Sequence, residues 1–313
     1  METTRSMVSF DWAMKRLLRN KANFEVLEGF LSELLSRKIL IRHIAESESN
    51  KTDEDDKSNR VDILVEADGR ELVIIELQYD SEADYFHRML YGTSKAVAEH
   101  IRAGDPYSEV RKVYSVNIVY FDLGKGDDYV YHGITNFTGL HTHNELELTA
   151  TQRRAYGKTA VGELYPEYYI IKVRGFNDVA ENTLDEWIYY LKNNRIKDGF
   201  TAQGLDMARK ILAFDNLSDE DKRRYLRSIE ERRIKDGEIH TALIEGEEAG
   251  LKKGEAIGLE KGEAIGEAKN LKKVIANGLR AGFSVETLST ITGLTPEEVM
   301  KMIKMIEGEE RNK

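Results

Sequence analysis

The chain has 313 residues, of which 41% are hydrophobic and 33% charged, and its net charge of −10 at pH 7 argues against a surface covered in phosphate-binding Lys and Arg. No apolar run approaches the ~20 residues of a membrane span, and the N-terminus METTRSMVSFDW lacks the apolar core of a signal peptide, so we expect a cytoplasmic protein with no membrane partner. The sequence contains no Cys, so any bound metal must be held by oxygen or imidazole ligands, and oxygen ligands favour Mg²⁺ or Mn²⁺.

The N-terminal part of the chain alternates between helical and strand patterns. Apolar residues at three- and four-residue steps predict a helix from Phe10 to Leu35, and a short apolar run at 39–44 predicts a strand. Helical periodicity returns at 84–104, and strands are predicted at 112–123, 128–137, 141–149 and 167–173. This order indicates an α/β fold, a mixed central sheet flanked by helices.

The segment RVDILVEADGRELVIIELQYD, residues 60–80, predicts a β-hairpin with polar residues inside apolar strands. Asp62 precedes Ile-Leu-Val, whereas Glu76 lies between Val-Ile-Ile and Leu. Strands this apolar on both faces are covered on both sides, and a buried carboxylate then needs a cation, a hydrogen-bond donor or a metal.

Two hairpin registers are compatible with this segment. A two-residue Asp68-Gly69 turn would pair Asp62 with Ile75 and place Glu76 on the opposite face. A three-residue loop of residues 67–69, with left-handed Gly69, would pair Asp62 with Ile74 and bring Asp62, Glu76 and Gln78 to one face. Only the second register makes a site.

The C-terminal part of the sequence is helical. Amphipathic segments at 183–193, 203–214 and 218–233 follow the last strand, and then six glycines recur every fourth residue from Gly246 to Gly266 within a Gly-Glu-Lys repeat. The repeat is either a flexible charged connector or a helix that pairs closely with another helix. Residues 270–306 predict three short helices resembling a helix-turn-helix. Ser284 can cap the second of these helices and Gly293 ends it, and Thr295 with Glu298 begins the third. The acidic start of the third helix favours packing or oligomer contact over DNA reading.

The acidic hairpin followed by E-x-Q resembles the PD-(D/E)xK nuclease superfamily. The segment FDWAMKRLL before the hairpin, the segment HRMLYGTSKAVAEHIRAGDPYSEVRKVYSVNIVYFDL after it, and the repeat in the tail are similar to the Rpn family of recombination-promoting nucleases and transposases. The resemblance extends from about Ser9 to Val173, and in the tail it is limited to the character of the Gly-Glu-Lys repeat.

This resemblance implies a restriction-endonuclease-like core that hydrolyses DNA with Mg²⁺ or Mn²⁺. It makes Asp62 and Glu76 the metal ligands and adds Gln78 and Asp11 to the catalytic residues, with Gln78 where the superfamily usually has Lys. Substrate binding is assigned to three further residues, Arg88, Tyr91 and Lys15, although core packing is an equal alternative for Tyr91.

Three regions and two alternative functions follow from these patterns. We expect a nuclease-like domain with a helical extension at 1–235, the repeat at 236–270 and a small helical tail at 271–313, with the C-terminal region forming a homo-oligomer. The alternatives to a DNA endonuclease are a catalytically weakened protein that binds DNA or a partner, and a ribonuclease of a toxin or defence system. His141 and His143 are interpreted as surface residues rather than as a zinc site.

Overall fold

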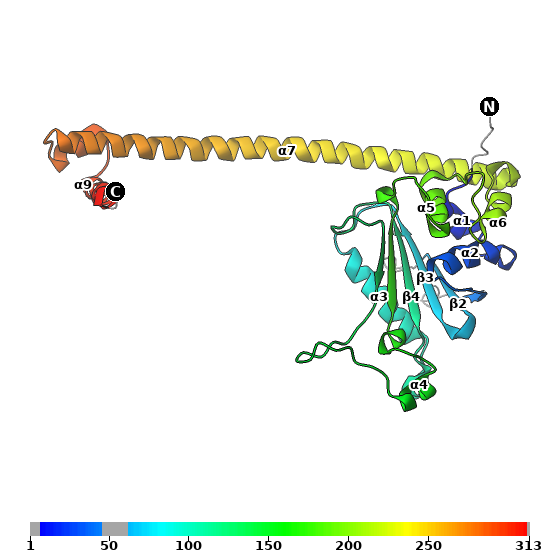
Figure 1. The fold of residues 1–313 in the computed structure, drawn as a ribbon. Helices are drawn as coiled ribbons and strands as arrows, with labels where there is room; N and C mark the ends of the chain where they lie inside the picture. The colour runs from blue at the N-terminus through cyan, green and yellow to red at the C-terminus, as the bar shows by residue number, and fades with distance from the viewer. Residues whose placement is uncertain (1–6, 46–61, 312–313) are drawn as a thin grey trace. The chain divides into compact units, whose positions relative to one another are not determined.

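The computed structural model describes residues 7–45 and 62–311 (Figure 1). The chain divides into two compact units, Met1–Arg227 and Ser228–Lys313. Within the described residues, no helix combines the length and the hydrophobicity needed to cross a bilayer.

The first unit is built on a six-stranded mixed sheet with the strand order β1-β2-β3-β4-β6-β5. The central pairs β3–β4 and β4–β6 are parallel and the outer pairs are antiparallel. The strands are β1 Ile41–Ile44, β2 Ile63–Ala67, β3 Leu72–Gln78, β4 Val113–Val119, β5 Val130–Gly133 and β6 Glu167–Lys172. The mixed sheet flanked by helices confirms the predicted fold class.

Helices cover both faces of this sheet. On one face, α3 Tyr85–Glu99 packs against Leu72, Ile74 and Val113. Because side chains alternate along a strand, even-numbered residues of β4 and its extension face the other way. There Tyr120 donates a hydrogen bond to the carbonyl of Leu191 (2.7 Å), which belongs to the second layer of helices. That layer contains α1 Phe10–Arg16, α2 Phe24–Leu34, α5 Thr183–Asn193 and α6 Leu205–Ile211 (Figure 1).

Aromatic side chains hold the second helical layer together. Phe10 of α1, Phe30 of α2, and Trp187 and Tyr190 of α5 meet edge to face, with ring centroids 5.6–6.1 Å apart. All four are fully buried. Such rings contribute large buried areas, so this cluster anchors α1, which carries two of the predicted site residues.

Two predicted elements differ in the structure. The helix predicted from Phe10 to Leu35 is broken into α1 and α2, because the Asn20 side chain accepts a hydrogen bond from the Ala22 amide and Asn23 donates to the Leu17 carbonyl. These local bonds compete with the helical ladder. The strand predicted at 141–149 is wrong, since only an isolated bridge between Thr138 and Glu145 forms, and α4 Ala150–Tyr156 follows.

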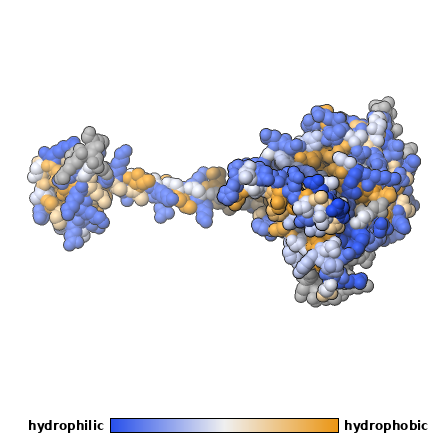
Figure 2. Space-filling model, turned by 60° about the horizontal axis from the view of Figure 1, so that its bottom comes forward, coloured by the Kyte–Doolittle hydropathy of each residue, from blue (hydrophilic) through white to orange (hydrophobic). Residues whose placement is uncertain are grey.

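The repeat segment is helical, as part of α7 Asp219–Arg280. Each of its six glycines, from Gly246 to Gly266, has no neighbour within 4 Å of where a Cβ would lie. Between the glycines, Leu251, Leu259 and Ile265 are about two-thirds exposed, and Figure 2 shows hydrophilic and hydrophobic surface alternating along the helix.

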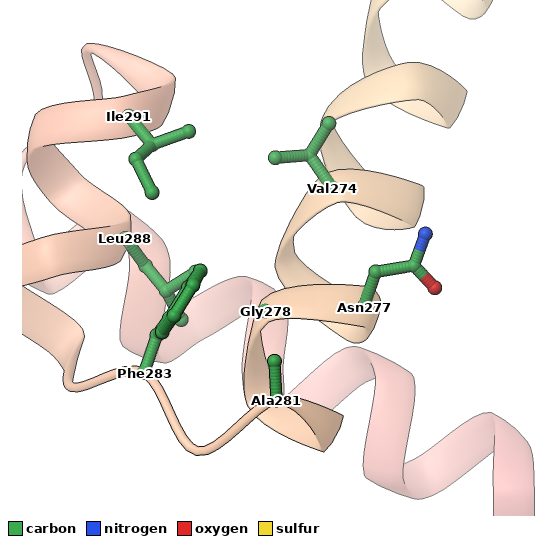
Figure 3. A pocket seen from close by; sticks show the side chains of 7 residues that line it. All are labelled: Val274, Asn277, Gly278, Ala281, Phe283, Leu288 and Ile291. Atoms are coloured by element: carbon green, nitrogen blue, oxygen red, sulfur yellow. The ribbon is translucent and has the colours of Figure 1, made fainter.

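The end of α7 forms a small three-helix core with α8 Val285–Thr292 and α9 Pro296–Arg311, centred on Ile275, Leu288 and Val299. The predicted Ser284 cap and Gly293 stop of α8 are both present. A mainly apolar pocket of about 370 Å³ opens between the end of α7 and α8 (Figure 3). Its lining residues are Val274, Asn277, Gly278, Ala281, Phe283, Leu288 and Ile291.

Candidate active site

The β2–β3 hairpin determines how the predicted carboxylates are placed. Its strands pair Ile63 with Ile75 and Glu66 with Leu72. Continued by one residue, this register brings Asp62 level with Glu76. Neither predicted register is correct, because the turn occupies residues 68–70, one residue later than the three-residue loop expected from sequence.

The turn geometry explains this shift. The Ala67 amide donates to the Glu71 carbonyl (2.9 Å) and so closes a three-residue turn. Within it, Gly69 has the predicted positive φ of 77°, and Arg70 is also left-handed at 63°. The register differs from the expected one by two residues, which leaves the face of each side chain unchanged. The hairpin therefore keeps Asp62 and Glu76 on one side of the sheet.

Asp62 stands just before β2, with its side chain largely removed from solvent. Its Oδ2 accepts a hydrogen bond from the Leu77 amide at 2.8 Å, which ties the carboxylate to the neighbouring strand. Burial raises the pKa of Asp62, and the negative charge of Asp11 raises it further, while the Leu77 bond and the charges of Lys15 and Arg88 act in the opposite direction. A cation near Asp62 would relieve this unfavourable burial.

Glu76 is the most buried acidic residue of the hairpin, with 7% of its surface exposed. Its Oε1 lies 3.3 Å from Nη2 of Arg88 on α3. Burial raises the pKa of Glu76, the charge of Arg88 lowers it, and the charge of Asp62 raises it again. The two carboxylates thus lie near enough for the charge of Asp62 to disfavour ionisation of Glu76.

A third carboxylate, Glu82, joins this group although the sequence analysis missed it. It lies in the connection between β3 and α3, where its Oε1 accepts hydrogen bonds from Nη1 of Arg88 (2.8 Å) and from Nε2 of Gln78 (3.0 Å). The only sequence signal is an acidic residue four positions after Gln78 in a polar loop. Such loops commonly supply solvated charges, so the signal is weak.

The first helix contributes Asp11 and Lys15 to the same region. Asp11 is buried, with 5% of its surface exposed, and its Oδ1 lies 2.6 Å from Nζ of Lys15 one helical turn later. Arg19, which follows α1, donates from Nη2 to the backbone carbonyl of Asp62 at 2.8 Å, so the end of α1 lies beside the hairpin. The structure therefore brings Asp11 and Lys15 near Asp62, where their charges act on its carboxylate.

Tyr91 is one turn beyond Arg88 on α3, and half of its surface is exposed. Core packing, the alternative considered for this residue, is therefore wrong. Its neighbours Phe86 and Leu90 are exposed to a similar extent. Tyr91 stands on the outer face of the helix that carries Arg88.

Behind Glu76 lies a buried polar network that the sequence analysis also missed. Asn117 of β4 pairs with Glu76 in the parallel register and accepts a hydrogen bond from the hydroxyl of Tyr85 (3.3 Å). Burial raises the pKa of Tyr85 well above its usual range, and the charge of Glu76 adds to this rise. A polar residue inside the apolar strand KVYSVNIVYF was the available signal, of the same kind that revealed Glu76.

The charges of the assembled site do not balance. Four carboxylates, Asp11, Asp62, Glu76 and Glu82, lie near three cations, Lys15, Arg19 and Arg88, which leaves one negative charge in excess. Within residues 7–45 and 62–311, no three Asp, Glu or His side chains are assembled as a ready-made metal cage. Mg²⁺ generally takes only one or two protein carboxylates and completes its shell with water and phosphate oxygens. Asp62 and Glu76 therefore fit one such ion.

Comparison with known proteins identifies the family. Residues 8–156 match the family model of the PD-(D/E)XK nuclease family transposase. This part of the chain is similar to that family. The match runs from the start of α1 through the hairpin and α3 to the end of α4, so it contains every residue of the site described above.

The match to the PD-(D/E)XK family indicates a nuclease or transposase-like function, and hence a hydrolase. Such nucleases generally use divalent metal ions. Searches of curated proteins and of solved structures give no significant match to the chain.

Proposed function

We propose that the chain is a metal-dependent endodeoxyribonuclease that hydrolyses phosphodiester bonds of DNA and promotes recombination or transposition. The observation that supports this most directly is that the hairpin places the two carboxylates Asp62 and Glu76 on one face of the sheet, where burial raises the pKa values of both. A divalent cation bound between them would offset their negative charge. A DNA substrate also agrees with the cytoplasmic location expected from the sequence.

Asp62 and Glu76 would hold the ion, Mg²⁺ or Mn²⁺. When bound, such an ion lowers the pKa of a water molecule and neutralises charge on the phosphate. Gln78, at the end of β3, orients the attacking water through a hydrogen bond. This role needs only a neutral polar group, which makes Gln a workable replacement for Lys.

Cationic side chains receive the phosphate. Arg88 offers a planar guanidinium with several donors, a geometry suited to phosphate oxygens, and the substrate competes with Glu82 for it. Lys15 supplies a second positive charge and is held in place by Asp11. Tyr91, exposed one turn from Arg88, contacts the DNA backbone beside the scissile phosphate.

A supercoiled plasmid assay tests the proposal. We expect nicking with Mg²⁺ or Mn²⁺, no nicking with EDTA, and loss of nicking in Asp62→Asn. The control is Asp84→Asn, which removes a charge from an exposed residue at the start of α3. Metal-independent binding without nicking would instead indicate the catalytically weakened binding protein, and cleavage of RNA alone would indicate the ribonuclease.

We also propose that the C-terminal region mediates homo-oligomer formation through α7. Interior helical glycines cost up to ~1 kcal/mol each relative to Ala, so an isolated helix with six of them is disfavoured. The open space at each glycine allows a second helix to approach closely. The exposed Leu251, Leu259 and Ile265 would then become buried between copies.

A further inference from the structure

The orientation of the Gln78 side-chain amide is determined by its neighbours. Its Nε2 donates to Oε1 of Glu82 at 3.0 Å and to the backbone carbonyl of Asp80 at 3.3 Å. A carboxylate and a carbonyl can only accept hydrogen bonds. The reversed amide would set oxygen against oxygen at both contacts, so Nε2 must face Glu82 and Asp80.

This orientation limits what Gln78 can offer to a substrate. Both hydrogens of Nε2 are used within the protein, so the atom of the amide that remains for a ligand is the acceptor Oε1. Gln78 and Glu76 are two residues apart on β3, so they share one face of the sheet. The oxygen therefore belongs to the same side as the metal-binding carboxylates. A Lys at this position would offer only donors and a positive charge.

Glu82 controls this arrangement and also restrains Arg88. The same Oε1 that accepts from Gln78 accepts from Nη1 of Arg88 at 2.8 Å, and Nη2 of Arg88 reaches Glu76. Gln78, Glu82, Arg88 and Glu76 thus form one continuous chain of hydrogen bonds. Removing Glu82 would release the amide and the guanidinium together.

We infer that Glu82 is a positioning residue of the proposed nuclease reaction, which holds the Gln78 amide so that its oxygen accepts a hydrogen bond from the attacking water. This inference rests on the proposed function. Glu82 itself stays bonded to Gln78 while the substrate competes for Arg88, and it does not touch the reacting atoms. In this respect the chain works differently from an enzyme in which an ammonium group occupies the position of Gln78.

The orientation can be measured without any nuclease activity. The measurement uses the full-length, metal-free protein, and the two side-chain NH₂ protons of Gln78 are assigned by their loss in Gln78→Met. We expect these protons to exchange with water at least about tenfold more slowly than those of a free amide, because both are hydrogen-bonded. Glu82→Met should remove the protection of the proton bonded to Glu82, and the control Asp84→Asn should keep the protection of both protons. Unprotected Gln78 protons in the wild type, or protection of both protons that survives Glu82→Met, would overturn the inference.

Kinetics test the consequence for the reaction. At saturating Mg²⁺ and DNA, we expect Glu82→Met to lower kcat about tenfold, the effect of losing one hydrogen bond. Glu82→Gln keeps an acceptor oxygen of the same reach and should recover most of the rate. Saturating DNA removes the effect of a released Arg88 on substrate binding, so the remaining effect of Glu82 on kcat acts through Gln78. Gln78→Ala combined with Glu82→Met should therefore have a kcat no lower than Gln78→Ala alone.

Multiplicative losses in the double variant, or a wild-type rate in Glu82→Met, would contradict the positioning role. A wild type that cleaves no nucleic acid would refute the proposed function, and with it the catalytic part of this inference. The exchange measurement would still decide whether Glu82 orients Gln78. Failure of the function and failure of the orientation are therefore separate results.

Discussion

Replacing Asp62 by Asn should uncouple the stability of the protein from divalent metal. The substitution keeps the shape of the side chain and an oxygen that can accept from the Leu77 amide, but removes one negative charge from the site. We expect the metal-free variant to be more stable than the wild type at neutral pH, because burial raises the pKa of Asp62 and its ionised form is unfavourable in the fold.

The size of the metal effect follows from linkage. At a metal concentration about 100 times Kd, a ligand that binds only the folded state stabilises it by about 2.7 kcal/mol. For a folded unit of about 150–250 residues, 1 kcal/mol shifts Tm by about 2–4 °C. The first unit spans Met1–Arg227, so saturating Mg²⁺ should raise its Tm by about 5–11 °C. Asp62→Asn should lose most of this rise.

Tryptophan fluorescence provides the assay. Both tryptophans of the chain, Trp12 and Trp187, are buried in the first unit, so thermal melts followed by their emission report on the unit that contains the site. The melts are run at constant ionic strength with Mg²⁺ or EDTA, and with Asp84→Asn as control. A wild type unaffected by Mg²⁺, an equal shift in Asp62→Asn, or a destabilised metal-free variant would refute the reasoning.

Three further predictions concern pH, assembly and packing. Burial raises the pKa values of Asp62 and Glu76, so the free energy of unfolding of the metal-free protein should fall as pH rises from about 4 to 7. Denaturant titrations of the double variant Asp62→Asn/Glu76→Gln should show a smaller fall. The same pH profile in the wild type and the double variant would contradict this. Deletion of residues 234–313 should lower the mass measured by light scattering while tryptophan emission stays native, whereas an unchanged mass would exclude assembly through α7. Gly29→Ala should lower the free energy of unfolding, measured in urea, by about 1–3 kcal/mol. The new methyl group would meet the Gln203 carbonyl and lie 2.6 Å from Cα of Gly204. An unchanged urea midpoint would contradict this packing.

Local sequence patterns were sufficient to predict many helix ends and turns of this protein. The Ser284 cap, the Gly293 stop and the reciprocal bonds between Thr295 and Glu298 depend on neighbours within a few residues, so the sequence predicts them well. The same is true of the left-handed Gly69 in the hairpin turn. The three-residue loop considered from the sequence also placed Asp62 and Glu76 on one face, and the observed register keeps this result because a shift of two residues preserves its parity.

Long-range contacts decided the rest. Residues 141–149 do not form a strand because, apart from the bridge between Glu145 and Thr138, they pair with no strand of the sheet. The position of Glu82 in the site also could not be predicted from neighbouring residues, because its hydrogen-bond partners lie at the end of β3 and on α3. Residues that meet only when separate elements pack leave no periodic trace in the sequence, and the tertiary structure alone brings Glu82 between Gln78 and Arg88.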